Sequence, residues 1–300
     1  MKTFASIAVG AWLVLTVTAG GAGAGIETKS DPNDVYWSDR FPVPGTNGEV
    51  NAAVKDAWGN IYIGGNFTLA GDIMAENVAR WNTSKSTWSG LGTGIGGIDH
   101  SRVLALAVDS SGNVYAGGYF TTAGGLEANC IARWDGTAWS ALGTGMEGGS
   151  DYPGTCVYAL AVDSSGNLYA GGDFTTAGGV AANYIAKWDG AAWSPLGTGM
   201  GGSSFTRVLA IAVDGLGAVY AGGMFTTAGG VTVNCAAKWD GTAWSALGTG
   251  IGGTDSHVDA LAVDGSGVYA GGAFTTAGGV SAKNIAKWDG MAWSALGIGI

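Results

Sequence analysis

One element, Gly-Gly-X-Phe, occurs five times in this 300-residue chain at nearly even spacing. Successive copies lie 49 to 54 residues apart, and each is followed by two tryptophans at nearly fixed distances. A constant period of roughly 20 to 50 residues is typical of chains that repeat one supersecondary unit. The repeat is marked by five phenylalanines: Phe67, Phe120, Phe174, Phe225 and Phe274.

The second unit shows how each repeat divides into strands. The apolar run 103–109 predicts a strand buried on both faces, and turn residues at 110–113 join it to a second strand at 114–121. A third strand is expected at 131–135 and a fourth at 139–143. Such short strands cannot bury both faces within one unit, so the units must pack around an axis. The predicted fold class is all-β: a β-propeller of about five four-stranded blades.

Ten of the 13 tryptophans occupy only two positions of the repeat. Because a buried indole contributes strongly to a core, we interpret both series as structural. The first series is Trp81, Trp134, Trp188, Trp239 and Trp288, and the second is Trp88, Trp139, Trp193, Trp244 and Trp293.

The sequence does not decide whether five blades close the propeller ring. Trp37 and Ser38 loosely match the start of a fourth strand, so segment 25–46 is expected to add an outer strand before the five-repeat propeller of 47–300. In one alternative, five blades close the ring by pairing the first blade with the fifth. In the other, the chain holds most of a six-bladed ring. Closure by five would pack Val54, Ile61 and Ile63 against Val263, Val268 and Ile285.

Residues 1–24 have the three-part pattern of a secretory signal peptide. Lys2 precedes an apolar run at 4–17, and small residues end the segment at Ala24. The run is shorter than the ~20 residues that span a bilayer, and no later stretch is long enough. We therefore expect a secreted, periplasmic or cell-surface protein without a membrane span after signal removal.

The charge balance and the cysteine count exclude two classes of protein: nucleic-acid binders and disulfide-framework domains. There are 13 Lys and Arg against 23 Asp and Glu, so no basic stripe is present and nucleic acid is not an expected partner. The three cysteines cannot all pair within the chain. Cys130 and Cys235 occupy one repeat position and are expected to be small fillers, whereas Cys156, in a connecting loop, is the thiol expected to react.

The repeats resemble the kelch family. A Gly-Gly doublet on the second strand, a basic residue before a Trp and a second spaced Trp carry the resemblance, which is nearest in the first unit, with Arg80-Trp81-Asn82 and Trp88. The other four units shorten the spacing through an Asp-Gly turn. That WDG form is similar to repeats of secreted bacterial proteins and of a fungal cortical bud-site marker ectodomain. The resemblance implies a kelch-like propeller fold and no particular activity.

Variation between the units is concentrated in the second-to-third and fourth-to-first connections. Because strands alternate in direction within a blade, these two kinds of connection share one face. Loops on a rigid scaffold commonly carry function, so we expect this loop-rich face to bind a protein or a glycan. The candidate binding residues are His100, Arg102, Asp151, Tyr152, Asp173, Phe205, Arg207 and His257.

Metal, cofactor and catalytic residues are not expected. Asp109 and Asp135, with their counterparts in other units, each open a tight turn, where an Asp accepts bonds from the following N–H groups. The two histidines are three repeats apart, and a zinc or copper site needs three or four convergent ligands.

Three functions remain in view at this level. The favoured one is a non-catalytic secreted propeller that binds through its loop-rich face. One alternative is a glycan hydrolase or lyase with carboxylates at the channel mouth, for which Glu76, Glu127, Asp151 and Asp173 are candidates. The other alternative is a structural module of a larger surface protein.

Overall fold

The computed structural model describes residues 45–149 and 154–299. The expected signal peptide, the expected outer strand before residue 45, Asp151 and Tyr152 lie outside the described residues. The described residues form strands and turns without any helix, so the predicted all-β fold is confirmed.

Five four-stranded antiparallel sheets are the blades of a β-propeller, as predicted, and in each the strands pair in chain order. The strands of the first three blades are β1 (Glu49–Lys55), β2 (Ile61–Asn66), β5 (Val78–Asn82) and β6 (Thr87–Gly90); β8 (Arg102–Val108), β9 (Val114–Tyr119), β12 (Ile131–Trp134) and β13 (Trp139–Ala141); and β15 (Val157–Val162), β16 (Leu168–Gly172), β19 (Ile185–Trp188) and β20 (Trp193–Pro195). Those of the last two are β22 (Arg207–Val213), β23 (Val219–Met224), β26 (Ala236–Trp239) and β27 (Trp244–Ala246); and β29 (His257–Asp264), β30 (Gly267–Ala273), β33 (Ile285–Trp288) and β34 (Trp293–Ala295).

Small sheets of two-residue strands connect neighbouring blades. In the first four blades, the segment after the fourth strand pairs with the second-to-third connection of the next blade, which sequence analysis had treated only as a long connection. The three-stranded sheets are β7 (Ile95–Gly96), β10 (Thr122–Ala123) and β11 (Leu126–Glu127); β14 (Met146–Glu147), β17 (Thr176–Ala177) and β18 (Val180–Ala181); β21 (Met200–Gly201), β24 (Thr227–Ala228) and β25 (Val231–Thr232); and β28 (Ile251–Gly252), β31 (Thr276–Ala277) and β32 (Val280–Ser281). The first blade has the pair β3 (Leu69–Ala70) and β4 (Ile73–Met74), extended by a bridge from Thr46 to Ala70.

The first strands of the blades lie side by side along the inside of the molecule. β8 packs against β1, β15 against β8, β22 against β15 and β29 against β22. Each of these strands carries a β-bulge near its start, for example between Val103 and Ala105 in β8. A bulge leaves one residue unpaired and turns the strand locally, so the residue at this position is free to differ between blades.

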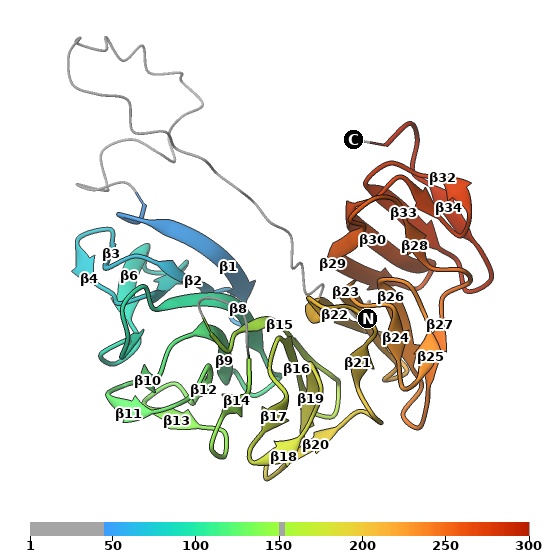
Figure 1. Cartoon of the computed structure of the whole chain (residues 1–300). Helices are drawn as coiled ribbons and strands as arrows, with labels where there is room; N and C mark the ends of the chain where they lie inside the picture. The colour runs from blue at the N-terminus through green and yellow to red at the C-terminus, as the bar shows by residue number, and fades with distance from the viewer. Residues whose placement is uncertain (1–44, 150–153, 300) are drawn as a thin grey trace, which may run out of the picture.

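The five blades form an open arc and do not close into a ring. Figure 1 shows the first blade, with β1, at one end of the arc and the fifth blade, with β29 and β30, at the other. Val54 packs toward the second blade, and Val263 and Val268 pack toward the fourth. The alternative in which the first and fifth blades pair is therefore wrong, because those valines are already used at the neighbouring junctions.

The two tryptophan series pair within each blade. Trp134 lies opposite Trp139 in the β12–β13 register, and the five such pairs have ring centroids 5.2 to 5.7 Å apart. Trp139, Trp193, Trp244 and Trp293 also donate from Nε1 to a leucine carbonyl of the preceding blade. The Nε1 of Trp88, in the first blade, is buried without a hydrogen-bond partner.

Candidate functional site

The loop-rich face is the side of the molecule on which the first strand of every blade begins. Arg102, Arg207 and His257 are the first residues of β8, β22 and β29, and they lie opposite Tyr119, Met224 and Ala273 on the neighbouring strands. Because those first strands are neighbours, three of the predicted binding residues are displayed along one edge of the arc.

A buried polar cluster lies on this face between the third and fourth blades. Asp173, directly after β16, is only 4% exposed. One carboxylate oxygen accepts the Cys156 N–H at 2.6 Å, and the other accepts the Tyr158 hydroxyl at 3.2 Å. The guanidinium of Arg207 lies 5.9 Å from the centre of the Tyr158 ring. The cluster thus joins two predicted residues, Asp173 and Arg207, through two that were not predicted to bind.

Burial controls the ionisation of this cluster. It raises the pKa of Asp173 above its usual range, although the bonds from Cys156 and Tyr158 oppose the shift. It also raises the pKa of the Tyr158 hydroxyl, mainly by desolvation. Desolvation, followed by the charge of Asp173, raises the pKa of the Cys156 thiol to about 11.

The expectation of a reactive Cys156 is therefore wrong. Its side chain is 0% exposed, and thiol reactivity requires access as well as a low pKa. Sequence analysis placed this residue in a connecting loop, but its position directly before β15 packs it beside Asp173. All three cysteines are free and buried.

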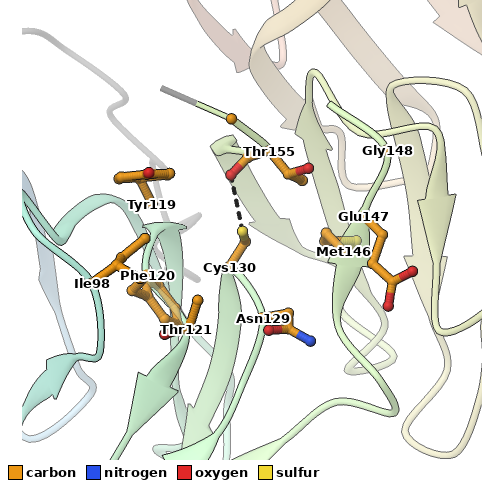
Figure 2. Close-up of a pocket in the computed structure, with 11 residues that line it drawn as sticks. Ile98, Tyr119, Phe120, Thr121, Asn129, Cys130, Met146, Glu147, Gly148 and Thr155 are labelled. Carbon is orange, nitrogen blue, oxygen red and sulfur yellow. Dashed lines mark hydrogen bonds between the residues drawn. The ribbon is translucent and has the colours of Figure 1, made fainter. Parts of the chain in front are cut away.

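A pocket opens on the loop-rich face between the second and third blades. Its volume is about 390 Å³, within the range of small-ligand sites. Figure 2 shows Tyr119 and Ile98 on one wall, Met146 and Glu147 on the opposite wall, and Cys130 and Asn129 between them. Thr155 lies at a further edge and accepts the Cys130 thiol through its carbonyl at 3.0 Å.

The pocket depends on residues that differ between repeats. The segment that joins β14, ending at Glu147, to β15, beginning at Val157, is longer than the connections to β8, β22 and β29. Tyr119 stands where the other blades carry Asn66, Asp173, Met224 or Ala273. The guanidinium of Arg102, 5.9 Å from the Tyr119 ring centre, packs over that ring. Arg102 is thus a candidate binding residue that packs on a residue of the pocket wall.

Among the described candidate residues, Phe205, His100 and His257 do not line the pocket. Phe205 is 58% exposed in the loop before β22, and His100 is exposed in the loop before β8 with a positive φ of 61°. His257 is 3.4 Å from the Asp259 carboxylate through Nε2, and its Nδ1 is 2.9 Å from the Asp255 carbonyl. Burial raises the pKa of Asp259, and the neighbouring histidine opposes that shift.

Tyr158 is the residue of the cluster that sequence reasoning missed. It occupies the bulge of β15, where β8 and β22 carry Leu104 and Leu209. The departure from leucine was visible in the repeat alignment. Its meaning depends on the bulge, which the sequence pattern did not predict.

The recurring aspartates lie on the opposite face and cap turns. Asp109 accepts the Ser111 and Asn113 N–H groups at one oxygen, and the Asn113 amide and Tyr115 hydroxyl at the other. Within residues 45–149 and 154–299, no group of three His, Cys, Asp or Glu side chains could hold a metal ion.

Known proteins provide only distant similarity. No protein-family model matches the chain, and a search of curated proteins found no match. Among solved structures, the extracellular domain of BT4673 from B. thetaiotaomicron is 14% identical, with a TM-score of 0.48 over 82% of this chain and 27% of that one. PorZ of Porphyromonas gingivalis is 15% identical, with a TM-score of 0.47 over 85% of this chain and 34% of PorZ.

Virginiamycin B lyase from Staphylococcus aureus is 12% identical, with a TM-score of 0.41 over 76% of this chain and 69% of the lyase. This chain thus spans about a third or less of BT4673 and PorZ. In the part of the chain that the structure describes, no helix has the length and apolarity to cross a membrane.

Proposed function

We propose that the chain is an exported, kelch-like propeller that binds a glycan through the pocket between its second and third blades. The observation that carries this proposal is the mixed character of the pocket. It combines an aromatic ring, Tyr119, with the carboxylate of Glu147 and the amide of Asn129.

Saccharide rings have the matching chemistry. Their C–H faces pack on aromatic rings, and their hydroxyls need donors and acceptors at the edge. Arg102 restricts the Tyr119 ring from one side, so less conformational entropy is lost when a ligand packs on it. Glu147 has an exposed side chain that can accept hydroxyl hydrogen bonds.

The state of Asp173 favours binding over hydrolysis. A general acid or base must reach the bond that reacts, but Asp173 is 4% exposed and both of its oxygens accept hydrogen bonds. Of the alternative carboxylates, Glu127 lies in β11 of a connecting small sheet, beside β13, and Glu76 lies in the bend between β4 and β5. The cluster around Asp173 therefore acts as a rigid support for the loop-rich face.

The test is calorimetric titration of the full chain with soluble cell-wall oligosaccharides, combined with product analysis. Tyr119→Ala and Glu147→Gln should each weaken binding by roughly tenfold or more, about 1.4 kcal/mol. Matched controls are Met224→Ala, at the equivalent site of the fourth blade, and Glu127→Gln, an exposed carboxylate of the second blade. Glycan hydrolysis that disappears in Glu147→Gln would replace binding by catalysis, and unchanged affinity in both pocket variants would refute the site.

Export has its own test. The mass of the mature protein from the native host should correspond to a chain that begins at Gly25. A cell-associated protein that retains residues 1–24 would contradict export with cleavage.

A further inference from the structure

The four junctions between blades share one steric feature. A glycine in the second strand of one blade faces a valine in the first strand of the next. A Cβ added at that glycine would lie only 2.4 to 2.5 Å from a valine methyl, so the methyl occupies the space that a side chain would need. The pairs are Gly64 with Val103, Gly117 with Val157, Gly171 with Val208, and Gly222 with Val258.

The same junctions share one hydrogen bond. The Nε1 of a tryptophan in the following blade donates to a leucine carbonyl of the preceding blade at 2.7 to 2.9 Å. The leucines that accept this bond are 1 or 2% exposed: Leu91, Leu142, Leu196 and Leu247.

The fifth blade carries the glycine and the leucine of these two features, but no following blade contacts them. A Cβ at Gly271 would meet nothing closer than 3.9 Å, and those atoms belong to its own blade. Leu296, the counterpart of the buried leucines, is 36% exposed. Ile285 and Tyr269 are partly exposed, whereas their second-blade counterparts Ile131 and Tyr115 are buried. We call Tyr269, Gly271, Ile285 and Leu296 the fifth-blade face.

We propose that the fifth-blade face docks a further blade of the same repeat. The incoming first strand would place a valine methyl against Gly271, and its second-series tryptophan would donate to the Leu296 carbonyl. Four junctions of this molecule already show this pairing, which defines the chemistry of the partner.

A second copy of this chain fits the face less well. Only its first blade could present an unpaired first strand. That blade has Val50 at the valine register and an unpartnered Nε1 in Trp88, but the remaining outward residues of β1 are Ala53 and Lys55. The β8 residues at the same register are Leu106 and Val108. Docking would therefore lose an aliphatic contact and bring a lysine into an apolar junction, which is unfavourable. The partner is a blade with the standard aliphatic first strand.

The experiment extends the full chain after Ile300 by a second copy of residues 201–251, which contains the fourth blade. Amide hydrogen exchange is measured in β30 and β33. Docking should slow exchange in both strands by about tenfold or more. Exchange that is unchanged in β30 and β33, or slowed only in β1 and β2, would overturn the proposal.

Gly271→Ala makes the test specific. In the original chain this change should leave the melting temperature unchanged, since the space beside Gly271 is open. In the extended chain it should abolish the added protection, because the methyl occupies the valine site. The matched control Gly222→Ala should destabilise the original chain, where Val258 lies 2.5 Å from the added carbon.

Two further outcomes decide against the proposal. Full protection in the extended Gly271→Ala chain would show that the glycine does not receive the partner. Self-association of the original chain that protects β30 and β33 would identify a second copy as the partner.

Discussion

The two faces of the arc differ in how their carboxylates are used. On the turn face, Asp109 and Asp135 are bonded by N–H groups of their own turns. On the loop-rich face, Asp173 is bonded by residues 15 and 17 positions away in the chain. The turn face repeats because each turn satisfies itself locally, whereas the loop-rich face is specific to each junction. Repetition therefore identifies the scaffold, and departures from it identify the candidate site.

The largest expected effect comes from a residue that serves the scaffold. Trp193→Ala removes a buried ring and the bond to the Leu142 carbonyl, and should reduce the free energy of unfolding by about 3–5 kcal/mol. Trp188→Ala should cost less, since that ring is half-buried. Urea denaturation measures both. Equal stability of Trp193→Ala and the wild type would refute the structural role of the second series.

The scaffold was largely predictable because its signals are local and repeated. Gly-Gly-X-Phe, the paired tryptophans and the Asp turns gave the blades and most strand positions. The two-residue strands of the small sheets were not predicted, since strands this short show no alternation of apolar and polar residues and pairs such as Ile95 with Ala123 join different blades.

The candidate site was less predictable because its side-chain pairings depend on strand register and bulge geometry, within a blade for Arg102 and Tyr119 and between blades for Arg207 and Tyr158. Arg102, Asp173 and Arg207 were identified as departures from the repeat, but their partners Tyr119 and Tyr158 follow from register and bulge geometry. The arc likewise stays open because its curvature follows from packing at the four junctions, which no single repeat encodes.

A smaller loss of stability is expected when a turn carboxylate is removed. Asp109→Ala leaves the N–H groups of Ser111 and Asn113 without their side-chain acceptor, and should cost about 1–3 kcal/mol. Ligand affinity at the loop-rich face should not change, because the turn lies at the opposite end of β8 and β9. A change in glycan affinity without a change in stability would break the distinction between the faces.

The buried carboxylate of the loop-rich face should produce a pH effect. Because burial raises the pKa of Asp173, its stabilising contribution is fully present below the unfolded value of about 3.9 and is lost as pH rises through the folded value. Asp173→Asn, which stays neutral, should remove this fall in stability. Denaturation midpoints from pH 3 to 8 test the sign, and the same fall in the Asn variant would exclude Asp173 as its source.

The smallest effect, and the sharpest contrast in sign, belongs to the exposed turn carboxylates. The Ala138 N–H, then the hydroxyl and N–H of Thr137, lower the pKa of Asp135 to about 2. Its contribution to stability is therefore present above the unfolded value of about 3.9 and is lost as pH falls through about 2. Asp135→Asn should slightly reduce the loss of stability at acid pH. It should leave the free energy of unfolding above pH 4 with the same pH dependence. NMR titration of the Asp135 carboxyl carbon tests the cause directly: a midpoint near 4 would show that the turn does not hold the ionised form, and the opposition in sign to Asp173 would then fail.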